Sequence, residues 1–523
     1  MRPWSDDAEI FRHRRAGGIL PSQRWTLGIL TFLGLQSVLY FAWWWFRLEH
    51  VNNVLLFVLL SMATWYGVFR IMVGWYNAFH VEQPVHVPAP PDLSVAIFTT
   101  ASPGEPYEMF VRTLAAARRI AYPHTTYLLD DTQDPRFAAL AAEMGAVHLE
   151  LIGIPGAKAG KINAALAKTA EDFILILDPD HIPFENFLER VLGQFDDPDV
   201  GFVQVCQAYY NAGESFVARA AAEQTFSFYG PIMQGMQGTG TAVAIGANCT
   251  FRRSALHSIG GHGIGLAEDL VTAIRLHAKG WRSVYIPEVL SRGLVPADLH
   301  SFLKQQLKWS RGVHDVLFRE YPAAFRRLTM HQRISYLMIG SYYLVGLTTL
   351  MYLTIPLVYL WTGLQPAAFL LDEYVRHALP VGLFGVLIYR YMQRWLCDPL
   401  RERGWHWRGT LLKVGSWTVY LQGLLLAILG IAVPYIPTAK ERRRTRFWKL
   451  ALVPGGIMVL SILTCAWTFY RELWVLAESE VRITTEVTFG MLSFTLVNMV
   501  LMSGRLYAAW VDRERVEVEA DQE

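Results

Sequence analysis

The sequence has little charge for its length and few cysteines. Asp, Glu, Lys and Arg make up only 18% of its 523 residues and hydrophobic residues 53%, whereas an average soluble protein is about 25% charged. Basic residues number 47 and acidic residues 45, and the resulting net charge of +2 gives no general attraction for nucleic acid. The four cysteines lack metal-ligand spacing, which argues against structural zinc and indicates unpaired thiols. We therefore expect neither a nucleic-acid partner nor a disulfide scaffold.

The sequence does contain apolar runs long enough to cross a bilayer, which takes about 20 residues. They form two groups on either side of a more polar stretch at residues 90–325, which has the composition of a soluble domain. The runs are 26–46 and 51–69 in the first group, and 334–361, 378–396, 411–433, 450–470 and 487–504 in the second. The first run lacks the small-residue cleavage site of a secretory signal peptide, so we expect it to remain as a membrane helix.

Basic residues predict which side of the membrane each loop faces. Arginines are frequent before the first run, whereas the link to the second run has only Arg47. Residues 1–24 should therefore be cytoplasmic, and the two membrane helices within 25–80 should return the chain to the cytoplasm. This makes the domain at 90–325 cytoplasmic, and two further membrane helices are expected within 330–396.

The run at 411–433 conflicts with this rule. The basic segment 440–446 follows it and should also be cytoplasmic, so a single crossing would leave one end on the wrong side. We therefore predict that 409–449 forms an interfacial or re-entrant segment, helped by the polar Lys413 and Gln422. Two last spans within 450–506 then bring an acidic tail, 511–523, to the cytoplasm, and the total is six spans.

The central domain has the alternation of strands and helices of a nucleotide-binding α/β fold. Apolar strand-like runs at 93–100, 126–131 and 173–177 are separated by segments with helical spacing. The second run ends in Asp130 and Asp131, and the third is followed by Asp178 and Asp180. Because ligands of open parallel sheets bind beyond the carboxyl ends of the strands, we expect these acids to line one site.

Asp178 and Asp180 have the chemistry of ligands for a divalent cation. A nucleotide diphosphate carries negative charge, and hard carboxylate oxygens suit the Mg²⁺ or Mn²⁺ that would neutralise it. Asp-x-Asp is also common by chance, usually as a solvated turn. Its position directly after an unbroken apolar strand favours the metal site.

Two later segments place polar side chains beside helical patterns. Glu268 and Asp269 begin a helix that ends at a glycine cap, where acids are often only caps themselves. The second segment, just before the third apolar run, contains Gln305, Gln306, Lys308, Trp309 and Arg311. A juxtamembrane aromatic belt with basic anchors would have the same composition.

Taken in order, these motifs resemble the D, DxD, (T)ED and QxxRW series of processive family-2 glycosyltransferases, the superfamily of cellulose, curdlan, chitin and hyaluronan synthases. Residues 158–163 and 204–211 are similar to that family's KAGxxN and QxxxFxN stretches, and 246–253 is similar to the acceptor-side segment of cellulose synthases. The resemblance covers about 93–315 and the flanking spans. It implies an α/β nucleotide-diphospho-sugar transferase domain of the GT-A type, inserted between transmembrane helices.

The segment 435–440 is similar to the FxVTxK gating loop of cellulose synthases, although Tyr435 replaces Phe and Pro437 replaces Val. A proline-broken basic loop at a membrane surface is the alternative. Two further departures are Ala267 in place of Thr, and Lys308 in place of Arg. An ammonium group cannot form the bidentate contact to phosphate that a guanidinium forms.

The resemblance implies a role for each candidate residue. Asp269 would be the general base, with Glu268 beside it in the catalytic centre, and Asp178 and Asp180 would bind Mg²⁺ or Mn²⁺. The residues expected at the donor nucleotide are Thr100, Glu105, Asp130, Asp131, Lys158, Asp178, Lys308, Arg311, Thr438 and Lys440. The residues expected at the acceptor are Cys249, Gln305, Gln306 and Trp309.

The implied function is processive, inverting transfer from a UDP-sugar, with UDP-glucose favoured, to a β-linked polysaccharide that leaves through the protein's own channel. The expected location is a bacterial inner membrane, with the catalytic domain and both termini cytoplasmic. The partners would be the donor, the nascent polysaccharide and the lipid bilayer, and an envelope export partner is compatible with them. Alternatives are a non-processive lipid glycosyltransferase of the ceramide glucosyltransferase kind, a chitin- or hyaluronan-type synthase using UDP-N-acetylglucosamine, a transporter, and a scaffold subunit without catalysis.

Overall fold

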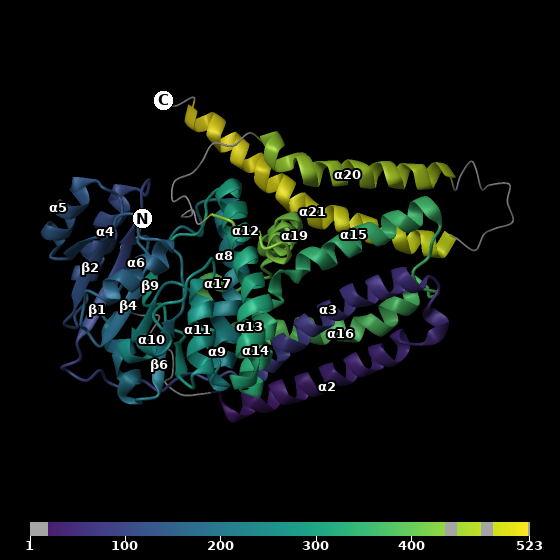
Figure 1. The fold of residues 1–523 in the computed structure, drawn as a ribbon. Coiled ribbons are helices and arrows are strands. Elements are labelled where there is room, and N and C mark those ends of the chain that lie inside the picture. Colours follow the sequence, from purple (N-terminus) through teal and green to yellow (C-terminus); the bar gives the residue numbers. More distant parts are fainter. Residues whose placement is uncertain (1–18, 435–446, 472–484, 521–523) are drawn as a thin grey trace.

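A computed structural model describes residues 19–434, 447–471 and 485–520. The chain forms an α/β domain and a bundle of long helices that extends from one side of it (Figure 1). The gating-like loop with Thr438 and Lys440 lies outside the described residues, so its predicted role remains a prediction.

The α/β domain is built on a seven-stranded mixed sheet with the order β3-β2-β1-β4-β7-β6-β8. Strands β3, β2, β1 and β4 run parallel, β7 is antiparallel to both of its neighbours, and β8 is parallel to β6. The strands are β1 Val95–Ala101, β2 Thr125–Asp130, β3 Val147–Glu150, β4 Phe173–Leu177, β6 Val200–Val205, β7 Cys249–Arg252 and β8 Arg282–Ile286. Every residue of β1, β4 and β6 is buried, as expected for apolar runs covered on both faces.

Helices cover the sheet and link its strands. They are α4 Tyr107–Arg118, α5 Pro135–Met144, α6 Ala157–Leu166, α7 Phe187–Val191, α8 Phe216–Ser227, α9 Met233–Gly238, α10 Arg253–Ser258, α11 Glu268–Ala278 and α12 Leu299–Asp315. A two-stranded sheet of β5 Ile182–Pro183 and β9 Ser291–Arg292 lies directly after the Asp-x-Asp segment. The strands expected at 93–100, 126–131 and 173–177 are confirmed, with ends shifted by one or two residues.

Five helical stretches within the described residues are long and apolar enough to cross a membrane: 21–45, 54–79, 330–362, 449–470 and 486–511. They comprise α2 Pro21–Trp45, α3 Val54–Phe79, α14 Met330–Gly340 with α15 Val345–Thr362, α20 Phe447–Tyr470 and α21 Thr485–Ala520. Most of the predicted span at 378–396 lies in helix α16 Leu371–Met392, which packs against α2. Arg376, His377 and Arg390 reduce its hydropathy, and it is not among the five. The chain is a membrane protein, and the total of six spans remains a prediction.

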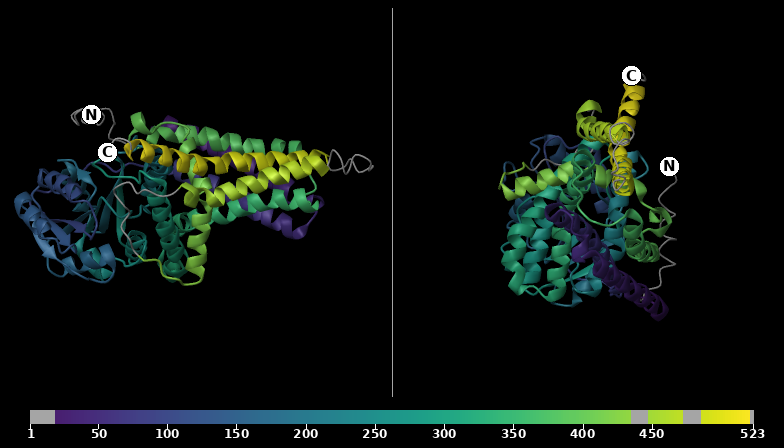
Figure 2. Two further views of the ribbon diagram at one scale, coloured as in Figure 1. Left: turned by 90° about the horizontal axis from the view of Figure 1, so that it is seen from above. Right: turned by 90° about the vertical axis from the view of Figure 1, so that its right-hand side faces the viewer.

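The run at 411–433 forms two short helices that are bent by 49° relative to each other, α18 Trp407–Gly415 and α19 Trp417–Ile428. Figures 1 and 2 show α19 running across the direction of the long helices, beside the α/β domain. A short helix, α17 Pro399–Glu402, precedes α18, and the four-residue α13 Tyr321–Ala324 lies between α12 and α14. The interfacial location of 409–449 remains a prediction, and its described part is a broken helix.

Candidate active site

Carboxylates gather where the sheet ends and α11 begins. Asp130 is the last residue of β2, and Asp178 and Asp180 follow β4, so the parallel strands bring these acids to one edge of the sheet. Glu268 and Asp269 form the first turn of α11. The buried Lys158 of α6 connects the two groups: its Nζ pairs with Asp178, and its charge acts on both acids of α11.

Asp178, Asp180 and His181 form a cluster that can hold a metal ion, because their ligand atoms all lie within 4.8 Å of one another. Asp180 and His181 are each only 2% exposed. The backbone N–H of Leu294 donates to Asp180 Oδ2 at 3.0 Å, and His181 Nδ1 lies 3.4 Å from Asp180 Oδ1. Two hard carboxylates and an imidazole suit a divalent cation. His181 was not predicted from the sequence, although it directly follows the Asp-x-Asp motif.

Lys158 carries positive charge into the centre of the site. Its Nζ pairs with Asp178 and also donates to the carbonyl oxygen of Gly246 at 2.7 Å. Burial opposes this charge, but the neighbouring carboxylates of Asp178 and Glu268 outweigh it and raise the pKa of Lys158. Lys158 therefore remains an ammonium ion, suited to a phosphate group.

Asp269 is held at the start of α11, where the backbone N–H of Leu270 donates to its Oδ1 at 2.8 Å. Its Oδ2 faces Gly246, and a Cβ added to that glycine would lie 3.4 Å away. Burial, together with the adjacent Glu268, raises the pKa of Asp269 to about 7. Burial also raises the pKa of Glu268. A carboxyl group with a pKa close to neutral is suited to accept a proton during a reaction.

The residues expected at the acceptor lie on β7 and α12. Cys249 is buried in β7 near Asp269, and burial raises the pKa of its thiol well above the ordinary value, so it remains protonated. On α12, the Tyr343 hydroxyl donates to Gln306 Oε1 at 3.4 Å, while Gln305 and Trp309 are half-buried. All four cysteines are free thiols, as expected.

Lys308 and Arg311 on α12 have different surroundings. The charge of Lys308 lowers the pKa of Glu268, against the larger effect of burial, so this ammonium acts on the acids at the start of α11. Arg311 is buried, pairs with Asp315 one turn later and donates from Nε to the carbonyl oxygen of Ile431 at 3.2 Å. The predicted contact of Arg311 with a diphosphate remains a prediction, and its contacts in the structure lead toward the end of α19.

Three of the residues expected at the nucleotide, Glu105, Asp130 and Asp131, form a second group around Lys161. This lysine is 2% exposed, donates to Ala101 O at 2.7 Å and to Ser102 Oγ at 2.8 Å, and lies 3.8 Å from Asp131. Its burial lowers its pKa, while the acids nearby oppose that shift. Lys161 was not predicted as a site residue from the sequence.

The residues expected at the nucleotide at the ends of β1 and β2 each have their own surroundings. Asp130 Oδ2 accepts from His148 Nε2 at 2.8 Å, and the backbone N–H of Gly153 donates to Asp131 Oδ1 at 2.9 Å. The backbone N–H of Ser102 donates to Glu105 Oε2 at 2.9 Å, and Thr100 is buried in β1. They thus lie at the ends of β1 and β2, and their contact with a nucleotide remains a prediction.

A mixed α/β sheet with an Asp-x-Asp cluster after its central strand and a buried carboxylate at a helix start defines a glycosyltransferase domain of the GT-A type. Residues 173–375 match the family model described as "Glycosyl transferase family group 2". The chain therefore contains a family 2 glycosyltransferase domain, and the expected enzyme class is confirmed.

Curated relatives are 28–29% identical to this chain over most of its length. The cellulose synthase catalytic subunit [UDP-forming] of Komagataeibacter sucrofermentans is 28% identical over 366 residues, which are 65% of this chain and 48% of that protein. The protein of the same name from Xanthomonas axonopodis pv. citri is 29% identical over 329 residues, 59% of this chain and 45% of that protein. The chain thus matches about half the length of these relatives.

Solved structures are more distant. A mannosyltransferase from Pyrobaculum calidifontis in complex with GDP-Man and Mn²⁺ is 15% identical, covers 72% of this chain and all of its own, and has a TM-score of 0.49. Glucosyl-3-phosphoglycerate synthase from Mycobacterium tuberculosis, in complex with Mn²⁺ and UDP-glucose, is 14% identical, with a TM-score of 0.31 and coverage of 42% of this chain and 78% of its own.

Proposed function

We propose that the protein transfers a sugar from a UDP-sugar, with UDP-glucose favoured, to a growing β-linked polysaccharide with inversion at the anomeric carbon. The observation that carries this proposal is the buried Asp269, with a pKa of about 7, in one site with Lys158 and the Asp178 cluster. The relatives named UDP-forming cellulose synthases support the choice of donor and product.

In the proposed reaction, Asp269 accepts the proton of an acceptor hydroxyl as that oxygen attacks the anomeric carbon and UDP leaves from the opposite face. An α-linked donor then gives a β-linked product. Asp178, Asp180 and His181 would hold Mg²⁺ or Mn²⁺, which neutralises charge on the leaving diphosphate. Lys158 would add a second positive charge beside it. Trp309 offers an aromatic face on which a sugar ring can stack.

The proposed setting is a bacterial inner membrane, with the catalytic domain on the cytoplasmic side. Five apolar helices and the positions of the basic residues support this arrangement. The bilayer and the nascent polysaccharide would be the partners, with the polysaccharide leaving between the membrane helices. An envelope partner for export is compatible with the same topology.

Incubation of the purified protein with a panel of UDP-sugars and Mg²⁺ or Mn²⁺ tests this proposal. UDP release, product size and linkage-specific digestion are measured together. The expected result is UDP release with UDP-glucose and a high-mass β-glucan. A glycolipid product would identify a non-processive lipid glycosyltransferase, and turnover with UDP-N-acetylglucosamine alone would identify a chitin- or hyaluronan-type enzyme.

Sugar transfer is expected to increase with pH through about 7. Burial and the adjacent Glu268 raise the pKa of Asp269 to about 7, and only the deprotonated carboxylate, present above that pH, accepts a proton. Below this value kcat/KM should fall by about tenfold per pH unit. Initial rates at saturating metal between about pH 6 and pH 8 provide the measurement. A flat profile would contradict the assignment of the base.

Lys308→Arg is expected to retain substantial activity, because a guanidinium offers more donors than an ammonium at the same place. Lys308→Met should lose a charge-assisted contact worth about 1.5 to 3 kcal/mol, hence roughly ten- to a hundredfold in turnover or donor KM. Lys304→Met, at an exposed position one turn earlier on α12, is the matched control. Normal kinetics with the Lys308→Met variant would show that Lys308 is only a membrane-surface anchor.

A further inference from the structure

Helix α18 has a buried, oppositely charged partner at each of its ends. At the N-terminal end, the backbone N–H of Gly409 donates to Oε2 of Glu223, on α8 of the catalytic domain, at 3.0 Å. At the C-terminal end, Arg505 of α21 donates from Nη1 to the carbonyl oxygen of Gly415 at 3.3 Å and to Thr418 Oγ1 at 3.0 Å. Glu223 and Arg505 are each only 6% exposed. α18 therefore connects the catalytic domain to the last membrane helix.

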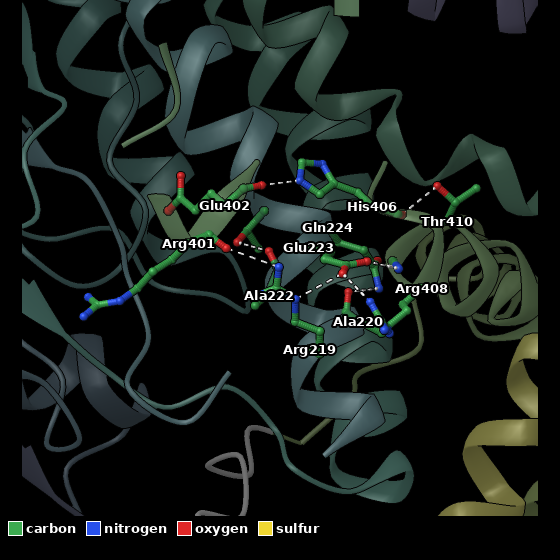
Figure 3. A network of polar contacts seen from close by, with 12 residues as sticks. Arg219, Ala220, Ala222, Glu223, Gln224, Arg401, Glu402, His406, Arg408 and Thr410 are labelled. Carbon is green, nitrogen blue, oxygen red and sulfur yellow. Dashed lines mark hydrogen bonds and ion pairs between the residues drawn. The ribbon is translucent and has the colours of Figure 1, made fainter. Parts of the chain in front are cut away.

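The signs of these charges match the helix dipole. Negative charge is favourable at the amino end of a helix, where N–H groups are free, and positive charge at the carboxyl end, where carbonyls are free. Figure 3 shows the amino-end network, in which Arg219 (Nε, 3.1 Å) and Arg408 (Nη1, 3.5 Å) also approach Glu223 Oε1. An ionised side chain buried among membrane helices is costly, so Arg505 is a candidate for a functional role.

Glycines bring the partners of α18 very close. A Cβ added to Gly409 would lie 2.9 Å from the Cβ of Glu223, and one added to Gly415 would lie 2.8 Å from the Cβ of Arg505. Both distances are too short for two carbon atoms. The position of α18 relative to α8 and α21 is therefore closely defined at both ends.

Helix α19 connects α18 to α12. The bend after Gly415 directs α19 against α12, where Ser310 Oγ donates to the carbonyl oxygen of Tyr420 at 3.1 Å. Arg311, the next residue of α12, donates to the carbonyl oxygen of Ile431 just beyond α19. The same helix α12 carries Gln305, Gln306 and Trp309, which are expected at the acceptor.

We propose that Glu223 and Arg505 are positioning residues that clamp α18 between the catalytic domain and the last membrane helix. Through α19, this clamp holds α12, with the acceptor residue Trp309, in its position relative to the carboxylate Asp269. The inference rests on the proposed function, because it assigns the clamp to acceptor positioning and not to donor binding.

The first test separates acceptor transfer from donor binding in the full-length purified protein. Glu223→Gln and Arg505→Met are expected to lower transfer from UDP-glucose to an oligosaccharide roughly ten- to a hundredfold, the cost of a misplacement of about 1 Å. UDP affinity should fall much less than the transfer rate, since Lys158 and the Asp178 cluster, which lie outside α12, are untouched. Arg505→Lys should restore part of the activity. Arg376→Gln, which breaks an exposed ion pair with Asp372 on α16, is the matched control and should change nothing.

The second test does not depend on activity. Amide hydrogen exchange should become faster in α18, α19 and α12 of the Glu223→Gln and Arg505→Met variants, and should stay unchanged in β1 and β4. Faster exchange in these helices supports the clamp even if no UDP-sugar is turned over. Absence of turnover would reject the proposed function but not the clamp. Unchanged exchange, unchanged acceptor transfer, or an equal loss of UDP binding and transfer would each overturn the positioning role.

Discussion

Asp269→Asn is expected to reduce sugar transfer by about two or more orders of magnitude while leaving UDP binding intact. The amide keeps the size of the side chain and the hydrogen bond that Leu270 N–H donates to it, at 2.8 Å in the wild type. It cannot accept the proton of an acceptor hydroxyl. Turnover should therefore fall with little change in the affinity for UDP, which calorimetry measures beside the rate of UDP release.

Two comparisons sharpen this result. Asp92→Asn makes the same substitution at an exposed position of the same domain and should leave the rate unchanged. Glu268→Gln removes the other acid of the α11 turn, whose negative charge contributes to the raised pKa of Asp269, so the pH profile of this variant should shift to lower pH. Equal activity of the Asp269→Asn variant and the wild type would exclude Asp269 as the base.

The sheet and the acidic edge could be predicted because their signals are local in the sequence. Strands β1 and β4 are unbroken apolar runs, and the acids follow directly after β2 and β4. Parallel pairing then brings Asp130 and Asp178 to the same edge without any further information. Glu268 and Asp269 could be placed at a helix start for the same reason, since an acid pair and a glycine cap enclose α11.

Long-range partners could not be predicted in this way. Lys161 is held by Ala101 and Ser102, about sixty residues earlier, and a buried lysine has no signature in the local pattern. Glu223 meets Gly409 across 186 residues, so nothing near either residue indicates the contact. Such pairs arise only when the chain has folded.

Charges along helices add details that the sequence patterns did not give. Asp315 lies one helical turn beyond Arg311 and pairs with it, and the contact of Arg311 with a diphosphate remains a prediction. The helix at the span expected at 378–396 begins at Leu371, where Asp372 and Glu373 occupy the first turn and acidic side chains are favourable.

Asp180→Asn is expected to abolish EDTA-sensitive sugar transfer, with turnover reduced by about a hundredfold or more, comparable to the loss of another essential catalytic group. Asp180 is almost fully buried, and its Oδ2 accepts from Leu294 N–H at 3.0 Å, so an amide oxygen can keep this contact and the fold. The variant loses the negative charge that favours a divalent cation between Asp178 and His181.

Binding of Mn²⁺ to the protein, followed by electron paramagnetic resonance without any sugar donor, reports on the cluster independently of catalysis. Affinity should fall at least tenfold for Asp180→Asn, and should be unchanged for Asp92→Asn, whose carboxylate is exposed and outside the cluster. Asp178→Asn should weaken Mn²⁺ binding as well, but it also removes the partner of Lys158, so UDP affinity should change with it. Undiminished metal-dependent turnover of the Asp180→Asn variant would exclude Asp180 as a ligand, because a buried carboxylate that holds the cation cannot be neutralised without loss of affinity.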